Sequence, residues 1–419
     1  MTFRAACLFI VFTAVRVSAI AADAVTFSRD VAPILQQKCQ LCHRPGTSAP
    51  MSLLTYDDAR PWARAIRQAV IRREMPPWHV ARDLGIQRFK NNRSLTDAEI
   101  QVLVRWVDAG APLGDPNDLP APLSWSDTNA WQLGAPDVIV SLPRRSVAAT
   151  GPDSWTDYIV DAGLAEDRYV RAVETKPSPA SRPGVHHVVT FLLQDGTESA
   201  DSYLSEYAVG KDGEVFPDDT GRLIKAGAKL RVNVHDHSTG RQLTDRMQIG
   251  LFLYRKGTVP RRQVVALTIG LLLLDDALDI PANSITTHQA YARLTKAARI
   301  ISFQPHMHLR GRAMTLEAIL PDGAREVLGA VDRFDFGTQI AYIFEDDVSP
   351  VLPAGTLLHA TATYDNTAAN RKNPDPSQWV GFGNRSVDEM FQCHVLMTEV
   401  GDDEYLALAA TRSQRKGDR

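Results

Sequence analysis

The chain has 419 residues, of which 44% are hydrophobic and 23% are charged, and its formal net charge at pH 7 is -3. This length exceeds that of one ordinary hydrophobic core, so we expect two or three domains. A charge so close to zero argues against nucleic acid or an acidic membrane surface as a partner.

The first 21 residues have the pattern of a secretory signal peptide. Arg4 supplies a positive start, residues 5–15 form an apolar run too short to span a bilayer, and Ala19-Ile20-Ala21 offers small residues for cleavage. A retained membrane anchor is the alternative interpretation. We expect a periplasmic or secreted protein whose mature chain has no integral membrane span.

Cys39 and Cys42 are separated by two residues and followed directly by His43, which is the spacing of a c-type haem attachment site. The two thiols bond covalently to the porphyrin, and His43 becomes the proximal iron ligand. A redox or zinc motif is the alternative, but it requires a βαβ setting or a second pair of ligands nearby. The sequence therefore predicts a bound haem c.

The residues around this motif, 22–114, have a helical pattern. Ser28 is the expected cap of a short first helix, and Thr55, followed by acidic residues, is the expected start of a second. Thr96 and Glu99 form a capping box for a third helix, which Gly110 ends.

This segment resembles a small class I cytochrome c, an all-α domain whose second axial ligand comes from a loop. Met75, in Met75-Pro76-Pro77-Trp78, is the best candidate for that ligand, because a thioether is a ligand that cytochromes c use. His79 and Met51 are the alternatives.

Beyond a proline-rich linker, residues 115–134, the period of hydrophobic residues changes from helical to two. Pro321-Asp322-Gly323 predicts a hairpin turn. We expect two all-β, jelly-roll-like sandwich domains, residues 135–277 and 278–405, and then a polar tail, residues 406–419. Strands are expected over residues 188–193, 229–234, 247–254, 300–304, 314–320 and 357–364.

Three pairs of histidines lie in this β region: His186-His187, His235 with His237, and His306 with His308. A lone histidine is usually a hydrogen-bonded core or surface residue, but three pairs favour metal binding. Residues two apart on a strand face the same side, so His306 and His308 can bind one ion. Neighbours face opposite sides, so His186 and His187 need a strand start or a bulge to share a metal.

The segment 229–235 alternates, which puts Leu230, Val232 and Val234 on the inner face and His235 on the other. Imidazole suits zinc, copper, iron and nickel, whereas a thioether ligand favours Cu(I). Met390 is therefore a candidate ligand, although a methionine near a strand end is ordinarily a core residue.

Four motifs follow one another in the order seen in one enzyme family: Gly184-Val185-His186-His187, Val234-His235, Pro305-His306-Met307-His308 and Asp388-Glu389-Met390. Over residues 135–397 the chain resembles the copper type II, ascorbate-dependent monooxygenases, which include peptidylglycine α-hydroxylating monooxygenase and dopamine β-monooxygenase. With the haem segment, it resembles bacterial proteins that fuse a cytochrome c to this copper module. The segments 364–366 and 373–376 look like ligand-supporting loops of that bacterial group.

The resemblance implies two copper ions, one in each sandwich domain. The electron-transfer copper would be held by His186, His187 and His235. The catalytic copper, which binds molecular oxygen and hydroxylates a C–H bond of a small organic substrate, would be held by His306, His308 and Met390. Electrons from a respiratory carrier or another small reductant would pass through the haem to the first copper.

The chain departs from the peptide-processing members of that family at two positions. Gln304 and His394 stand where those enzymes have the Arg and Tyr that hold the substrate carboxylate. We therefore do not expect a glycine-extended peptide substrate, and His237 and Cys393 have no assigned role. Two other readings are an electron-transfer protein without oxygenase activity and a sandwich whose histidines are structural or store copper.

Overall fold

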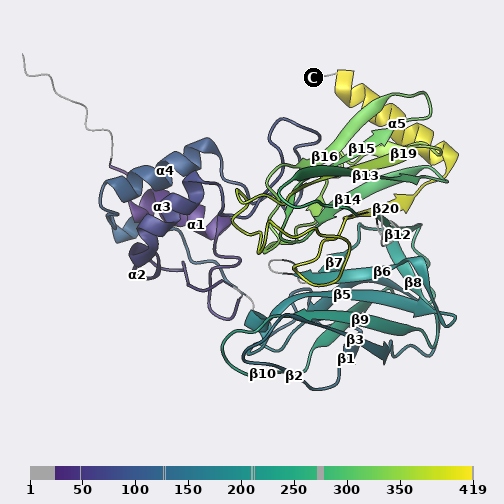
Figure 1. The fold of residues 1–419 in the computed structure, drawn as a ribbon, viewed down its shortest axis with the longest axis horizontal. Coiled ribbons are helices and arrows are strands. Elements are labelled where there is room, and N and C mark those ends of the chain that lie inside the picture. Colours follow the sequence, from purple (N-terminus) through teal and green to yellow (C-terminus); the bar gives the residue numbers. More distant parts are fainter. Residues whose placement is uncertain are drawn as a thin grey trace, which may run out of the picture.

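The computed structural model describes residues 24–417, apart from residues 48, 126, 128, 209, 210, 212 and 271–277. The expected signal peptide and the expected domain boundary at residue 277 lie outside the described residues. Figure 1 shows the helices α1–α4 gathered at one end of the molecule and the strands in two stacked units. No helix of the described part of the chain is both long and apolar enough to cross a membrane.

The helical end contains four α-helices, one short π-helix (η1) and one short 3-10 helix (η2). The helix start predicted at Thr55 and the capping box predicted at Thr96 are confirmed, and Thr55 also forms a capping box, with Asp58. The first cap is Thr26, not the predicted Ser28, because the buried Ser28 hydroxyl donates to the carbonyl of Leu113 at 2.9 Å. The elements are η1 (Phe27–Val31), α1 (Ala32–Lys38), α2 (Tyr56–Ala59), η2 (Arg60–Trp62), α3 (Ala63–Ile71) and α4 (Asp97–Asp108).

The strands fill the rest of the chain up to a C-terminal helix. All six predicted strands and the predicted hairpin turn are confirmed. The elements are η3 (Pro116–Asp118), β1 (Val138–Ser141), β2 (Arg145–Val147), β3 (Ser154–Asp161), β4 (Arg168–Lys176), η4 (Arg182–Gly184), β5 (Val185–Gln194), β6 (Thr197–Ala208), β7 (Gly213–Val215), β8 (Thr220–Ile224), β9 (Lys229–Asp236), β10 (Leu243–Asp245), β11 (Gln248–Leu253), β12 (Arg262–Ile269), β13 (Ile285–Arg293), β14 (Ala298–His306), β15 (Gly311–Ile319), β16 (Arg325–Val331), β17 (Tyr342–Ile343), β18 (Val351–Leu352), β19 (Leu357–Asp365), β20 (Gln392–Glu399) and α5 (Asp402–Gly417).

A ten-stranded sheet runs through both halves of the β region: eight strands follow the order β1-β11-β4-β8-β12-β20-β14-β17, and β7 and β18 pair beside this path, with β4 and β14. The sheet β3-β9-β5-β6 packs on its first half, and the sheet β13-β19-β15-β16 packs on its second half. Strand β12, before the expected domain boundary, pairs along six residues with β20, after it. The two sandwiches therefore share one sheet.

The expected fold class, a small all-α cytochrome c domain followed by two jelly-roll-like sandwich domains, was wrong. The structure is 37% strand and 15% helix, and the helices α1–α4 have only 7, 4, 9 and 12 residues. Between α3 and α4 the chain leaves the helices and enters the core of the second sandwich. Val80 forms a bridge with Val331 and Phe89 forms one with Phe344.

The chain between α3 and α4 enters the second sandwich because this segment carries large apolar side chains. Trp78 packs edge-on against Tyr342, with 5.0 Å between ring centroids, and Phe89 stacks on Phe344 at 5.3 Å. All of these side chains are buried in one core. Burial of each large apolar side chain stabilises the fold by roughly 1.5–3 kcal/mol, so this segment is fixed in the β core.

Candidate metal centre and adjoining cavity

The first three candidate ligands lie where β5 begins and β9 ends. The two strands are paired, and their register shifts between Val185 and His187, which is the bulge predicted for two neighbouring ligands. His235 lies opposite His187 in this pairing. The alternation predicted for β9 is also confirmed, because its apolar residues face the core.

Three ring nitrogens converge in this "three-nitrogen group" of His186, His187 and His235. The Nδ1 atoms of His186 and His187 are 3.0 Å apart, and those of His187 and His235 are 3.4 Å apart. Nitrogen ligands of a tetrahedral metal ion, each at about 2.0–2.1 Å from it, lie roughly 3.3–3.4 Å from one another. Within the described residues, this is the one cluster of three or more His, Cys, Asp or Glu with ligand atoms within 4.8 Å of one another.

Asp153 fixes the tautomer of His235. The Nε2 atom of His235 lies 2.9 Å from a carboxylate oxygen of Asp153, which accepts, so Nε2 carries the hydrogen and Nδ1 keeps its lone pair. Burial acts to raise the pKa of Asp153, but hydrogen bonds from His235 and Ser386 hold it below its usual value. The lone pair of His235 faces Nδ1 of His187, and a cation held between the imidazoles would offset the repulsion between their lone pairs.

The imidazoles of the candidate ligands His186, His187, His306 and His308 are neutral at pH 7. Burial lowers the pKa of His186 to about 3 and that of His308 to about 4, and it lowers the pKa values of His187 and His306 well below the usual range. Neutral imidazole is the form that binds a metal ion.

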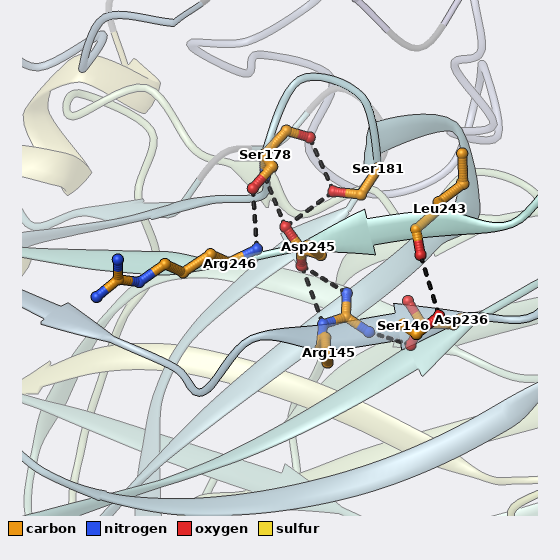
Figure 2. A network of polar contacts seen from close by, with 8 residues as sticks. All are labelled: Arg145, Ser146, Ser178, Ser181, Asp236, Leu243, Asp245 and Arg246. Atoms are coloured by element: carbon orange, nitrogen blue, oxygen red, sulfur yellow. Dashed lines mark hydrogen bonds and ion pairs between the residues drawn. The ribbon is translucent and has the colours of Figure 1, made fainter.

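A buried ion network holds the two chain segments that carry the three-nitrogen group (Figure 2). Arg145 donates from Nε and Nη2 to Oδ2 of Asp245, at 2.9 and 2.7 Å, and from Nη1 to Asp236, the last residue of β9. Asp245 also accepts from the Ser181 hydroxyl, at 2.8 Å, in the turn that leads into β5. The network therefore joins the end of β9 to the start of β5.

The second pair of candidate ligands lies at a strand end. Strand β14 ends at His306, so His308 follows in a turn and the predicted alternation along a strand does not apply. Their ring centroids are nevertheless 5.4 Å apart. Nδ1 of His306 lies 3.1 Å from Oε1 of Gln339, and Nδ1 of His308 lies 3.1 Å from the carbonyl of Asp388. Both oxygens accept, so each Nε2 keeps its lone pair for a ligand.

Glu389 ties this turn to the segment that carries Met390. Its fully buried carboxylate accepts from the backbone N–H of His308 at 2.8 Å and from that of Arg310 at 2.6 Å. Met390 follows directly and is half-buried, and the Tyr364 hydroxyl donates to its carbonyl at 2.7 Å. The backbone at Met390 is thus fixed beside the His306–His308 turn.

Arg310 joins the loops that were expected to support the ligands. Its Nε donates to Oδ1 of Asn366 and its Nη1 donates to the carbonyl of Val387, both at 2.8 Å. Asn373 donates to the same Asn366 oxygen at 2.9 Å. The segments 364–366 and 373–376 therefore surround the turn that carries the second pair.

The two sets of ligands adjoin each other, although they were expected in separate sandwiches. The ring centroids of His187 and His306 are 5.9 Å apart. Phe336 lies against both sets, 4.7 Å from His186 and 5.3 Å from His308 between ring centroids. We call the three-nitrogen group and the His306–His308 pair together the histidine centre.

The two positions that depart from the peptide-processing pattern lie beside this centre. Gln304 donates to buried Glu206 and accepts from Lys211 at 3.0 Å. The ring centroid of His394 is 6.1 Å from that of His306, and burial lowers the pKa of His394 to about 4. This wall of the centre is a buried polar network without an arginine clamp.

The other two unassigned residues lie outside the converging nitrogens. The ring centroid of His237 is 6.2 Å from that of His186. Cys393 is fully buried in the core of the second sandwich.

A cavity of about 400 Å³, the "Cys39 cavity", lies between the helices and the β region. One wall contains Cys39, Cys42 and His43, and the opposite wall contains the segments 213–215 and 337–341. This volume lies in the range of cofactor sites. Nδ1 of His43 lies 3.2 Å from the carbonyl of Met51, so Nδ1 carries the hydrogen and Nε2 keeps its lone pair. The residues present fit a covalently attached haem.

Met75 is the axial candidate that lines the Cys39 cavity. His79 is buried elsewhere, with Nε2 at 3.0 Å from the Thr338 hydroxyl, and burial lowers its pKa to about 4. Met51 contributes its carbonyl to His43. The geometry favours Met75 among the three alternatives.

Sequence reasoning missed Asp153, Gln339 and Phe336. Asp153 reaches the centre only because β3 pairs with β9, where Trp155 lies opposite His235. Gln339 and Phe336 come from the irregular chain between β16 and β17. None of the three stands in a motif, and no local signal in the sequence could have identified them.

Comparisons with known proteins leave the chain without an assigned family. No family model and no curated protein matches it. The solved structure of PNGF-II is 9% identical with a TM-score of 0.27, and the match covers 58% of this chain and 60% of that one. A Paenibacillus xanthan lyase is 10% identical with a TM-score of 0.18, over 68% of this chain and 28% of that one.

The VP2 protein of infectious bursal disease virus is also 10% identical, with a TM-score of 0.19, over 64% of this chain and 76% of that one. This chain thus spans less than two thirds of the length of the first two proteins. TM-scores this low support no inference about the function of this chain.

Proposed function

We propose that this protein is an exported haem- and copper-containing oxidoreductase that uses molecular oxygen to hydroxylate a C–H bond of a small organic substrate. The observation that carries this proposal is the histidine centre. Three imidazole nitrogens converge at the spacing of metal ligands, and two further imidazoles beside them keep their Nε2 lone pairs. The motif resemblance to the copper type II, ascorbate-dependent monooxygenases supports the choice of copper.

Two ligand sets follow from this proposal. His186, His187 and His235 hold one copper ion, and His306, His308 and Met390 hold the second. Two imidazoles with a thioether favour Cu(I) and leave a coordination position open. Copper bound in these sets supplies one-electron transfer and the activation of O₂.

The protein's own groups prepare these sites by holding protons on the distal ring nitrogens. Asp153 holds the Nε2 hydrogen of His235, and Gln339 holds the Nδ1 hydrogen of His306. Each of these hydrogen bonds orients its ring and makes the opposite nitrogen more basic. Phe336, which is 9% exposed, covers both sets and limits the access of water.

The Cys39 cavity is the proposed site of haem c. Cys39 and Cys42 attach the porphyrin, His43 is the proximal ligand and Met75 is the second axial ligand. Haem bound there supplies one-electron transfer from a respiratory carrier or another small reductant. The signal-peptide pattern supports a periplasmic or secreted location, where c-type haem is attached in bacteria.

This proposal is tested by measuring the copper and haem content of the purified protein. The protein is exported from cells that also produce haem-maturation factors, loaded with copper and then desalted. We expect about two copper ions and about one haem per chain, because each ligand set holds one ion. His235→Ala and His306→Ala should each remove about one copper and leave the haem in place.

His288→Ala is the matched control, because His288 lies on β13, outside the histidine centre. Oxygen uptake with a reductant should be lost in His306→Ala. Full copper loading without oxygen uptake would support the electron-transfer reading instead. Absence of copper in the wild-type protein, or copper that none of these substitutions removes, would contradict the proposal.

A further inference from the structure

The short segment Phe336–Gln339 forms the partition between the Cys39 cavity and the histidine centre. Gly337, Thr338 and Gln339 line the cavity. At the other end of the segment, the ring of Phe336 packs against His186 and His308. The segment therefore offers a route for an electron from a group in the cavity to the centre.

Gln339 contacts both sides of the partition. Its side chain is 2% exposed, it lines the cavity, and its Oε1 accepts a hydrogen bond from Nδ1 of His306 at 3.1 Å. Its Nε2 donates to the carbonyl of Phe336 at 3.3 Å. A carbonyl only accepts, so this second bond fixes which amide atom faces His306. One side chain therefore connects the cavity wall to a candidate copper ligand through one hydrogen bond.

The contact between the partition and the three-nitrogen group is weaker, because it contains no hydrogen bond. Phe336 contacts His186 by ring stacking, with 4.7 Å between centroids. The distal nitrogen of His235 points to Asp153, on the side of the first sandwich. Electronic coupling falls more steeply across a van der Waals gap than along covalent bonds and a hydrogen bond, so the Gln339 route is the favoured one.

We propose that electrons enter the histidine centre at His306 through Gln339, and not at the three-nitrogen group as the resemblance implied. This inference rests on the proposed function and deepens it. With haem and copper bound, one electron would pass from Fe²⁺ of the haem to Cu²⁺ held by His306, His308 and Met390, which would give Fe³⁺ and Cu⁺. No bond is made or broken, and an external one-electron reductant restores Fe²⁺.

Gln339→Leu tests this route because it replaces the amide by an apolar side chain of similar size. The variant therefore loses the hydrogen bond to His306. A flavin photoreductant delivers one electron to the oxidised, copper-loaded protein without oxygen, and the absorbance of the reduced haem is followed as it decays. We expect the decay to slow by about tenfold, the lower end of the change in metal affinity or activity that follows the loss of a ligand's hydrogen-bond partner. The EPR signal of Cu²⁺ at the second site should disappear at the same slower rate.

Thr338→Val is the matched control. Thr338 lines the same wall, but its hydroxyl lies at 3.0 Å from His79 and not from His306. The haem decay in this variant should equal that of the wild type. An equal decay in Gln339→Leu and the wild type, with both copper ions bound, would overturn the inference.

His235→Ala gives an independent test that does not depend on the folding of Gln339→Leu. This variant lacks copper in the three-nitrogen group and keeps the proposed entry site. We expect an unchanged haem decay, and its loss with copper still bound by His306 and His308 would overturn the inference. Wild-type protein without haem or copper would instead contradict the proposed function itself.

Discussion

The three-nitrogen group and the His306–His308 pair use the same side chain on different supports. The first is built on two paired strands, where the ladder of backbone hydrogen bonds and one bulge bring three nitrogens together. The second lies at the end of β14 and in the turn after it, and it is positioned by loops that meet at buried Glu389 and Arg310. A strand ladder produces a closed, preorganised site, whereas loops leave room for an open coordination position.

Each group also depends on one buried arginine. Arg145 holds the strand ends behind the first group, and Arg310 holds the loops behind the second. If the two groups have separate supports, a substitution of Arg145 lowers copper binding at the three-nitrogen group alone. A substitution of Arg310 then lowers copper binding at the His306–His308 pair alone.

The largest effect is expected for Arg145→Met. Asp236 and Asp245 would be left buried without their partner, which should lower the free energy of unfolding by about 3–5 kcal/mol. Copper should be lost from the three-nitrogen group first. Chemical denaturation and copper analysis measure both effects.

Arg144→Met is the control for that substitution, because Arg144 is the exposed neighbour. Its effect on the free energy of unfolding should stay within about 0.5 kcal/mol. A loss of copper from the His306–His308 pair in Arg145→Met, with the three-nitrogen group still loaded, would refute the division between the groups.

Arg310→Met should have the next largest effect. It removes the charged hydrogen bonds to Asn366 and to the Val387 carbonyl, so the free energy of unfolding should fall by about 1.5–3 kcal/mol. Copper should leave the His306–His308 pair and stay in the three-nitrogen group. Exposed Arg312→Met is the control, and equal copper loss from both groups would count against the comparison.

Asp153→Asn sharpens the comparison within the three-nitrogen group. The carboxylate that orients His235 becomes a neutral amide, so copper affinity there should fall by about 10-fold to 100-fold. Competition with a chelator of known affinity measures the change. Asp157→Asn, at an exposed position of β3, should leave the affinity unchanged, and an equal loss in both variants would contradict the role of Asp153.

The smallest effect is expected for Ser386→Ala. Ser386 lies where the loop that leads to Met390 contacts Asp153, the partner of His235. Its hydroxyl donates to Asp153 at 2.8 Å, so the loss of this bond should lower the free energy of unfolding by about 0.5–1.5 kcal/mol. A double-mutant cycle with Asp153→Asn measures the coupling between the groups. Strict additivity would show that the groups adjoin without an energetic connection.

Local signals in the sequence predicted much of this protein correctly. The helix start at Thr55, the capping box at Thr96 and the six strands were all predicted from residues a few positions apart, and His186-His187 were predicted to lie at a strand start or a bulge. Such features depend on side chains that meet their own backbone or on a fixed period, so short stretches of sequence determine them. The histidine pairs were identified in the same way, whereas their division into two ligand sets came from the family resemblance.

Only the tertiary structure decided the fold class and the surroundings of the centre. Trp78 and Phe89 lie outside the helical end because they are buried against Tyr342 and Phe344 in the core of the second sandwich. Asp153 meets His235 across 82 positions of sequence, and Gln339 meets His306 across 33. Contacts of this kind are fixed by strand pairing and by competition for burial over the whole chain, so the sequence by itself determined the candidate ligand residues while the tertiary structure decided what orients and connects them.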